Sequence, residues 1–275
     1  MNILMIGLTG LCTLMTGAIL FFFLGYLVSR GASSLNWAFF TKLPAPVGEI
    51  GGGMANAIVG SGKVLLLATL IGVPIGFLGG VYLNEYAGAT MAFVIRYATD
   101  LLNGVPSIVI GIVVYALVVH PMGHFSTFAG GVALGIMMIP ISVRSTEEFL
   151  HAVPMSLREA AIALGASKWK AIVTVIIPAA IRGIVTGTML DFARVAGETA
   201  PLLFTALGNQ FWSPGWNHET ATLPFVVYTY ALSAYQDWHR QAWAAGFVLL
   251  MLVLGINVTA RLILSRGSYR PSGGA

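Results

Sequence analysis

The sequence carries very little charge. Aspartate, glutamate, lysine and arginine together supply only 9% of its 275 residues, against about 25% in soluble domains. Hydrophobic residues make up 57% of the chain. Since so few charges cannot cover the surface of a water-soluble fold, the composition predicts an integral membrane protein.

Cysteine is almost absent as well. The one cysteine, Cys12, lies in the first apolar stretch, so an intrachain disulfide and a cysteine-based metal site are excluded. The five histidines lack the spacing beside a carboxylate that zinc sites use. We therefore expect no metal site in this chain.

Nucleotide and nucleic-acid motifs are also missing. The basic residues are scattered without interleaved aromatics, which argues against nucleic acid as a partner despite the formal net charge of +4. Residues 60–63 resemble the end of a phosphate-binding loop, but Ala57 stands where its first glycine would be and Val64 replaces the Ser or Thr. No nucleophile, base and orienting group occur at usable spacing. We expect no catalytic residue, no ATP site and thus no enzyme.

Long apolar stretches are what the sequence has in abundance. A helix needs about 20 apolar residues to cross a hydrocarbon core of about 30 Å. The predicted spans, bounded by charge, Pro or Gly, are residues 3–29, 62–83, 94–119, 127–143, 172–206 and 241–264. They predict an all-α polytopic fold of about six transmembrane helices, with residues 1–275 as a single domain. The fifth stretch is too long for one straight crossing and should bend or continue beyond the bilayer.

The basic residues between these stretches are distributed unevenly. The larger group contains Arg96, Arg144, Arg158, Lys168, Lys170, Arg182, Arg261, Arg266 and Arg270, and the smaller one Arg30, Lys42, Lys63 and Arg240. The richer side of a membrane protein faces the cytoplasm. We therefore expect a multi-pass membrane protein with both termini in the cytoplasm. Segments 30–61 and 207–240 should then face outward.

The predicted cytoplasmic loop 145–170 contains a short amphipathic helix. Leu157, Ala161 and Leu164 share one face by their three-and-four spacing, and Gly165 lets the backbone turn sharply before a second helix begins. Small residues on that face would permit a partner to dock closely. A helix lying on the membrane surface explains the same pattern, and composition leaves both interpretations open.

Charged residues inside apolar stretches are candidates for a substrate path. Arg194 and Glu198 are four apart and are expected to face each other on a helix, with Asp191 on the same face. The pair could lock helix packing or line a path. Arg144 and Glu147 form a second candidate pair near the inner mouth, which could equally be a positive-inside anchor with a surface ion pair.

These residue types suit an oxyanion. The planar guanidinium of arginine recognises phosphate oxygens. A carboxylate can also accept the proton that phosphate carries near neutral pH and that sulfate lacks.

One motif in the loop has specific spacing. Glu159, Ala160 and Ala161 are followed by three residues, then Gly165, then nine residues and the segment 175–178. This pattern resembles the EAA loop of ABC importer permeases. The resemblance implies that Glu159, Ala160, Ala161 and Gly165 dock a cytoplasmic ATPase. It also implies that ATP and Mg²⁺ bind to that partner and that this chain carries no cofactor.

A second stretch, residues 193–207, resembles the fifth helix of the A-type permease family of bacterial phosphate uptake systems. Residues 56–61, 104–111, 121–125 and 208–213 support that resemblance. It implies a type I ABC importer transmembrane domain of the bacterial inner (cytoplasmic) membrane that imports phosphate. The implied partners are a C-type permease subunit, two ATPase subunits, an extracytoplasmic phosphate-binding protein and membrane lipid. Asp191 departs from the family pattern.

Two other functions remain open from the residues alone. One is an ABC permease for another oxyanion, such as sulfate or molybdate. The other is a secondary transporter driven by an ion gradient, in which Asp191 and Glu198 would carry protons.

Overall fold

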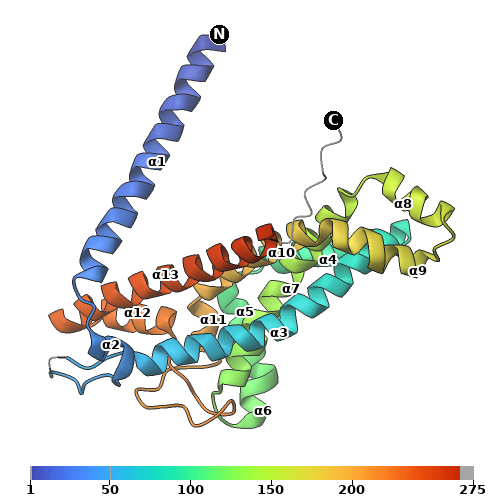
Figure 1. The fold of residues 1–275 in the computed structure, drawn as a ribbon. Coiled ribbons are helices and arrows are strands. Elements are labelled where there is room, and N and C mark those ends of the chain that lie inside the picture. The colour runs from blue at the N-terminus through green and yellow to red at the C-terminus, as the bar shows by residue number, and fades with distance from the viewer. Residues whose placement is uncertain (1, 50, 267–275) are drawn as a thin grey trace.

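The computed structural model describes residues 2–49 and 51–266, and helices account for all of its named elements (Figure 1). This confirms the all-α fold. The helices are α1 Asn2–Ala32, α2 Trp37–Thr41, α3 Ala55–Glu85, α4 Ala89–Gly104, α5 Ser107–Val114, α6 His120–Met122, α7 Thr127–His151, α8 Met155–Ala163, α9 Lys168–Ala171, α10 Ile177–Ala196, α11 Ala200–Leu203, α12 Leu223–Ala231 and α13 Gln236–Arg266. Two π-helical segments, η1 Tyr115–Val119 and η2 Ile172–Ile176, join α5 to α6 and α9 to α10. Arg270, expected in the cytoplasm, lies outside the described residues.

Five helical segments are long and apolar enough to cross a membrane, and a bent pair makes up to six. The pair is α4 with the helix from Ser107 to Met122, bent by 99°. The stretch predicted at 94–119 is therefore not one straight helix. Pro106 has no backbone N–H to donate and disfavours helical geometry at Val105, which adopts φ −71° and ψ 129°.

The core of the bundle is the contact between α3 and α7. A Cβ atom built on Gly72 or Gly80 of α3 would lie 2.5 Å from the Cβ of Met138 or Thr146 of α7. Between them, Gly76 meets Ser142 in the same way. Small residues four apart let two helix backbones approach closely in lipid, where no hydrophobic force drives them together. The two helices therefore form one tightly fitted unit.

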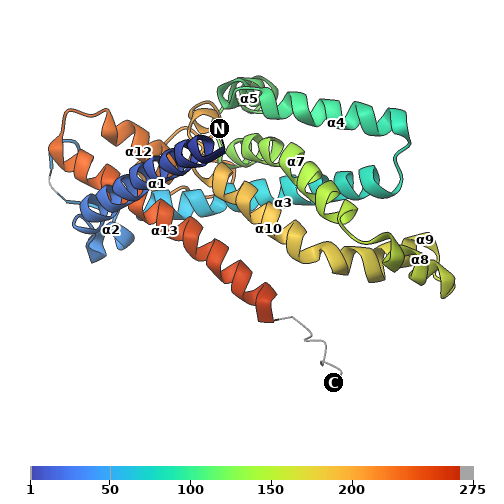
Figure 2. The same ribbon diagram turned by 90° about the horizontal axis from the view of Figure 1, so that it is seen from above.

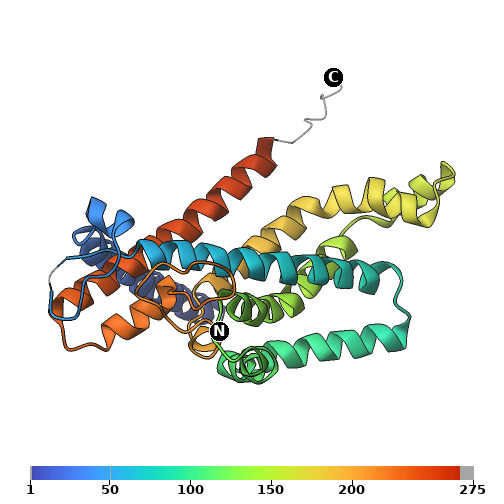
Figure 3. The same cartoon turned by 90° about the horizontal axis from the view of Figure 1, so that it is seen from below.

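Glycines of α7 and α10 make similar approaches. A side chain on Gly131 would collide with Leu67 of α3, and one on Gly183 or Gly187 with Phe149 or Ser145 of α7. Figure 2 shows α7 between α4 and α10, and Figure 3 shows α8 and α9 at the end of the bundle, beyond α10. The central helix α7 thus contacts both α4 and α10.

In contrast, α1 projects from the bundle (Figure 1). No residue in its most apolar window is buried. The C-terminal end of α1 contacts α13: the rings of Tyr26 and Trp243 lie 5.2 Å apart, and Gly31 packs against Phe247. The apolar surface of α1 is therefore available to lipid or to another transmembrane subunit.

Candidate functional site

A cavity of about 500 Å³ opens between α7 and α10. Its charged and polar lining includes Arg144, Ser145 and Glu148 from α7 and Asp191 and Arg194 from α10. The structure thus brings three of the predicted path residues, Arg144, Asp191 and Arg194, to one hollow. Polar groups of this kind inside apolar helices mark substrate paths by their cost in lipid.

Asp191 is the most buried of these groups, with 2% of its surface exposed. The hydroxyl of Ser142 donates to its Oδ2 at 3.3 Å, while Oδ1 has no partner. The neighbouring Ser145 Oγ is also buried and unpartnered. Since nearly all buried polar atoms are hydrogen-bonded, the two unpartnered atoms set this part of the α7–α10 contact apart, although neither atom is open to the cavity in this conformation.

The predicted ion pair between Arg194 and Glu198 is wrong. Helix α10 ends at Ala196, and Gly197 caps it. Glu198 therefore lies beyond the helix, where the spacing of one turn no longer applies. Among the described residues, no carboxylate oxygen lies within 4.0 Å of an Arg194 nitrogen.

Arg194 is accordingly not held between two carboxylates as predicted. Asp191 accepts from Ser142 instead, and Glu198 does not line the cavity. Arg194 is exposed and reaches the cavity without an ion-pair partner in the described part of the chain.

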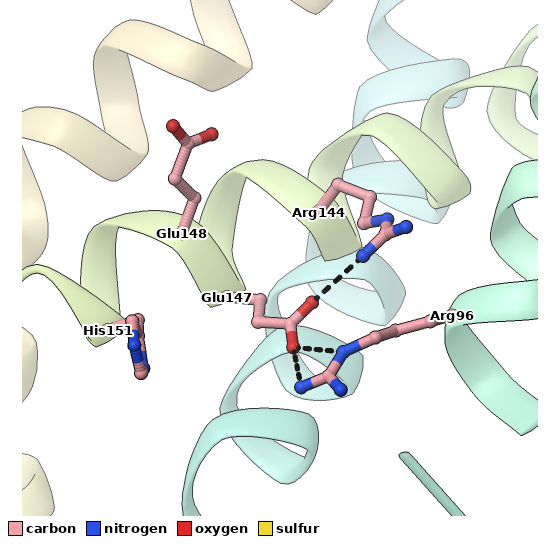
Figure 4. Close-up of a pocket in the computed structure, with 5 residues that line it drawn as sticks. All are labelled: Arg96, Arg144, Glu147, Glu148 and His151. Atoms are coloured by element: carbon pink, nitrogen blue, oxygen red, sulfur yellow. Dashed lines mark hydrogen bonds and ion pairs between the residues drawn. The ribbon is translucent and has the colours of Figure 1, made fainter. Parts of the chain in front are cut away.

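The second predicted pair is present but belongs to a larger network, which we call the arginine network: Arg96, Asp100, Arg144 and Glu147. Figure 4 shows Arg96, Arg144 and Glu147 of this network. Arg144 Nη1 lies 3.6 Å from Glu147 Oε2, and its Nη2 lies 2.6 Å from Asp100 Oδ2. Arg96 donates to Glu147 Oε1 through Nη2 at 2.6 Å and Nε at 2.7 Å. Two arginines and two carboxylates thus join α4 to α7 with balanced charge.

A second cavity of about 440 Å³ adjoins this network. Its lining contains Arg96, Arg144, Glu147, Glu148 and His151, drawn in Figure 4. Arg144 and Glu148 line both cavities. Arg144 therefore lies between the cavity lined by Arg194 and the second cavity, which extends to His151 at the C-terminal end of α7.

Sequence reasoning missed Arg96 and Asp100 as members of the site. They belong to α4, far along the chain from α7, so no local spacing connects them to Arg144. Their own four-residue spacing was the available signal, because it places both on one face of a helix.

The predicted docking segment, which we define as α8, the turn at Gly165 and α9 (residues 155–171), has the expected helix–turn–helix form. Helix α8 ends at Ala163, Gly165 adopts φ +82°, and α9 begins at Lys168. This left-handed backbone favours glycine over residues with a side chain. Glu159, Ala160 and Gly165 are exposed, whereas Ala161 is buried.

The segment also exposes large apolar side chains. Leu164 is 90% exposed, and Met155, Ile162 and Trp169 are mostly exposed too. An apolar surface on a polar loop marks a contact site for another protein or for the membrane surface.

Comparisons with known proteins agree with this architecture. Residues 72–266 match the family model described as binding-protein-dependent transport system inner membrane component. The phosphate transport system permease protein PstA of Yersinia pestis is 45% identical over 243 residues, covering 88% of this chain and 82% of that protein. The protein of the same name from Haemophilus influenzae is 44% identical, covering 95% of this chain and 93% of its own length.

Solved structures support the fold. A methionine ABC transporter in an inward-facing conformation matches with a TM-score of 0.61 at 19% identity, covering 79% of this chain and 95% of that chain. An amino acid ABC transporter matches with a TM-score of 0.55 at 20% identity, covering 77% and 91%. The chain is therefore a member of the binding-protein-dependent transport permease family, and its relatives at 44–45% identity in that family are A-type phosphate permeases.

Proposed function

We propose that this chain is the A-type permease subunit of an ATP-driven importer of inorganic phosphate. The observation that carries the proposal is the 44–45% identity to phosphate permeases over 82–93% of their length. Within this function, the chain forms the translocation path with a C-type permease subunit. Two ATPase subunits bind ATP and Mg²⁺, and an extracytoplasmic binding protein delivers phosphate.

Arg194 is the main phosphate contact in this proposal. It is exposed at the cavity and makes no ion pair within the described residues, so its five N–H donors are available for anion oxygens. Phosphate would replace water on the guanidinium without having to displace a protein carboxylate.

Arg144 would bind phosphate less tightly than Arg194. Asp100 and Glu147 already bind its guanidinium, so an anion must compete with both carboxylates. Binding there is consequently weaker than at Arg194. A path conducts only when its sites bind weakly enough to release the ion, and a neutralised arginine towards the inner mouth suits release.

Asp191 provides a basis for selecting phosphate over sulfate. Its unpartnered Oδ1 is buried beside the cavity, and a movement of α10 against α7 would let it accept a hydrogen bond from the hydroxyl of protonated phosphate. Sulfate has no proton to donate at neutral pH, and its charge would face the carboxylate directly. This arrangement favours phosphate over the alternative oxyanions.

The orientation that we propose is supported by the basic side chains that contact the two ends of α3. Lys63, near the start of α3, contacts the carbonyl of Ser213, while Arg158 and Lys168 contact Glu85 at its end. Positions 63 and 85 are 22 residues apart, about 33 Å along an α-helix, close to the thickness of the hydrocarbon core. We place the end with Arg158 in the cytoplasm of a bacterial cell, with both chain termini.

In this orientation the docking segment faces the ATPase. Glu159, Ala160 and Gly165 lie on its exposed surface and would contact the motor. Ala161, being buried, would act by letting α8 lie close to the rest of the chain.

The test is transport by the complete complex in proteoliposomes with radiolabelled phosphate. Uptake should require ATP and the binding protein, and sulfate or molybdate in excess should compete poorly. Uptake driven by a proton gradient without ATP would reject the proposal in favour of a secondary transporter. Uptake of sulfate in preference to phosphate would reject phosphate as the substrate.

A further inference from the structure

Both arms of the docking segment are attached to the last turn of α3. Arg158 of α8 forms an ion pair with the carboxylate of Glu85 through Nη1. Lys168 of α9 donates to the backbone carbonyl of Glu85, and its Nζ lies 4.7 Å from the centroid of the Tyr86 ring. These four residues, Glu85, Tyr86, Arg158 and Lys168, are called the clamp.

The same arginine reaches a third helix. Arg158 Nη2 donates to the carbonyl oxygen of Leu150 at 2.8 Å, near the end of α7. Asn84 Nδ2 donates to Glu85 Oε1 at 2.7 Å, which holds the carboxylate in place. One guanidinium therefore connects α8 to α3 and α7 at once.

The ion pair of the clamp is shielded from water, whereas Tyr86 and Lys168 are exposed. The Glu85 side chain is 5% exposed and that of Arg158 is 16% exposed. A buried ion pair of this kind has fixed geometry, because the removal of either partner leaves an uncompensated charge. The fork of arginine also serves two acceptors in different directions, which the single ammonium of lysine cannot reproduce.

The two short helices bury little apolar surface of their own: Ala161 is the one buried residue of α8, and Ala171 is the one buried residue of α9. Apolar packing continues directly after α9, where Ile172 of η2 joins a buried cluster with Val81 of α3 and Leu150 of α7. The polar contacts of Arg158 and Lys168 therefore add to this packing and to the chain connections in fixing the position of the docking segment.

A force on the clamp acts directly on the substrate-path helix. Gly72, Gly76 and Gly80 fit α3 closely against α7, and a contact packed this tightly transmits a displacement of one helix to the other. Helix α7 carries Arg144 and Ser145, which line the cavity.

From this geometry we propose that the clamp transmits the movement of the docking segment to α3 and α7. Arg158 and Glu85 act as positioning residues, which convert ATPase motion into opening and closing of the cavity. The inference rests on the proposed function only in requiring that an ATPase drives the chain. It assigns a mechanical role to residues that contact neither phosphate nor, in the case of the buried Glu85, the ATPase.

The test compares Arg158→Lys and Glu85→Gln with the wild-type complex in proteoliposomes. Both variants keep a polar side chain of similar length but break the buried ion pair or its fork. We expect ATP hydrolysis to continue while the phosphate moved per ATP falls about tenfold, as for loss of a coupling free energy of ordinary size. Arg182→Lys is the matched control, because Arg182 is an exposed arginine of α10 outside the clamp. It should keep the wild-type ratio.

A second measurement does not depend on the identity of the substrate. In a Cys12→Ser background, Leu190→Cys places a thiol at the cavity, and its labelling rate reports opening. Vanadate trapping of the ATPase should change that rate in the wild type and leave it unchanged when Arg158→Lys is added. An unaltered response and an unaltered phosphate-to-ATP ratio would overturn the inference.

The two proposals fail in distinguishable ways. If the wild-type complex hydrolyses ATP and changes thiol labelling without moving phosphate, the substrate assignment is wrong while the clamp stays testable by labelling. If Arg158→Lys does not assemble, Glu85→Gln carries the same comparison. Loss of the ATPase from both purified variants would show that the clamp builds the docking surface and does not transmit movement, which also overturns the inference.

Discussion

The arginine network and the clamp use the same chemistry in different surroundings. In each, an arginine binds a carboxylate of a neighbouring helix. In the network, Arg96 and Arg144 are 46% and 38% exposed and border cavities. In the clamp, Arg158 is 16% exposed and Glu85 is 5% exposed. An arginine that borders a cavity can exchange its carboxylate for a substrate anion, whereas an enclosed one can only hold two helices together.

Arg194 is the arginine most available to a substrate anion, since it forms no ion pair with a carboxylate among the described residues. Arg194→Ala should reduce phosphate uptake by a factor of about 10² or more, as for the loss of a charged donor that meets the substrate. Arg194→Lys should restore little, because an ammonium lacks the planar fork. Radiolabelled uptake normalised to membrane abundance measures both. Arg182→Ala, on the same helix, is the control.

The charge exchange Arg194→Glu with Glu198→Arg sharpens the same point. Since the structure contains no ion pair between these residues, the double variant should transport no better than Arg194→Ala. Full recovery of uptake would mean that Arg194 only neutralises Glu198 and that the substrate role is wrong.

Arg158→Ala tests the enclosed ion pair between Arg158 and Glu85. It leaves the Glu85 carboxylate buried without its partner, a change that costs about 3–5 kcal/mol. We expect a large fall in thermal stability of the detergent-solubilised complex and in its membrane abundance. The more conservative Arg158→Lys should keep most of the thermal stability while still lowering the phosphate moved per ATP. Equal stability of Arg158→Ala and the wild type would remove the distinction between the two groups.

Asp191 combines features of both groups, because it is buried like the clamp and borders the cavity like the network. Asp191→Asn keeps the volume but replaces one carboxyl oxygen by an amide nitrogen, which donates a hydrogen bond and cannot accept one. If Oδ1 accepts the phosphate proton, discrimination against sulfate should fall about tenfold, as for the loss of one hydrogen bond to a charged group. Competition of sulfate with labelled phosphate gives the ratio. An unchanged ratio with lower stability would assign Asp191 to helix packing through Ser142.

Arg96→Gln should give the smallest effect. Its guanidinium is largely exposed, and Arg144 remains beside Glu147 after the substitution. We expect a stability loss of no more than about 1 kcal/mol, with a modest change in uptake. Chemical denaturation of the purified complex and uptake at two salt concentrations would measure it. A stability loss as large as that of Arg158→Ala would contradict the comparison.

The sequence predicted what depends on local pattern. Apolar length identified the long apolar helices, although the structure breaks the stretches predicted at 94–119 and 172–206, and the spacing around Gly165 identified the turn between α8 and α9. The three-residue spacing of Arg144 and Glu147 correctly placed them in contact within α7.

What the sequence could not supply depends on distant contacts or on where a helix ends. Arg194 and Glu198 have helical spacing, but α10 stops between them. Glu85 gave no sign of its contact with Arg158, because the two belong to separate helices brought together by packing of the whole bundle. Pro106 was visible, yet its effect on the third apolar stretch depended on whether neighbouring helices would satisfy the freed backbone groups.

The π-helical segment η2 has a consequence for changes in chain length. A π turn amounts to one extra residue in an α-helix, and η2 lies between α9 and α10. Because this widened turn absorbs the extra residue, deleting Val173 would let the segment close to regular α-helical winding with α10 kept near its present face. The same deletion between residues 177 and 190, where the winding is already α-helical, would instead rotate Asp191 and Arg194 by about 100° relative to α9 and turn them away from α7, although no residue of the cavity had been replaced. Natural variation in this family should therefore tolerate a one-residue deletion within residues 172–176 better than one between residues 177 and 190.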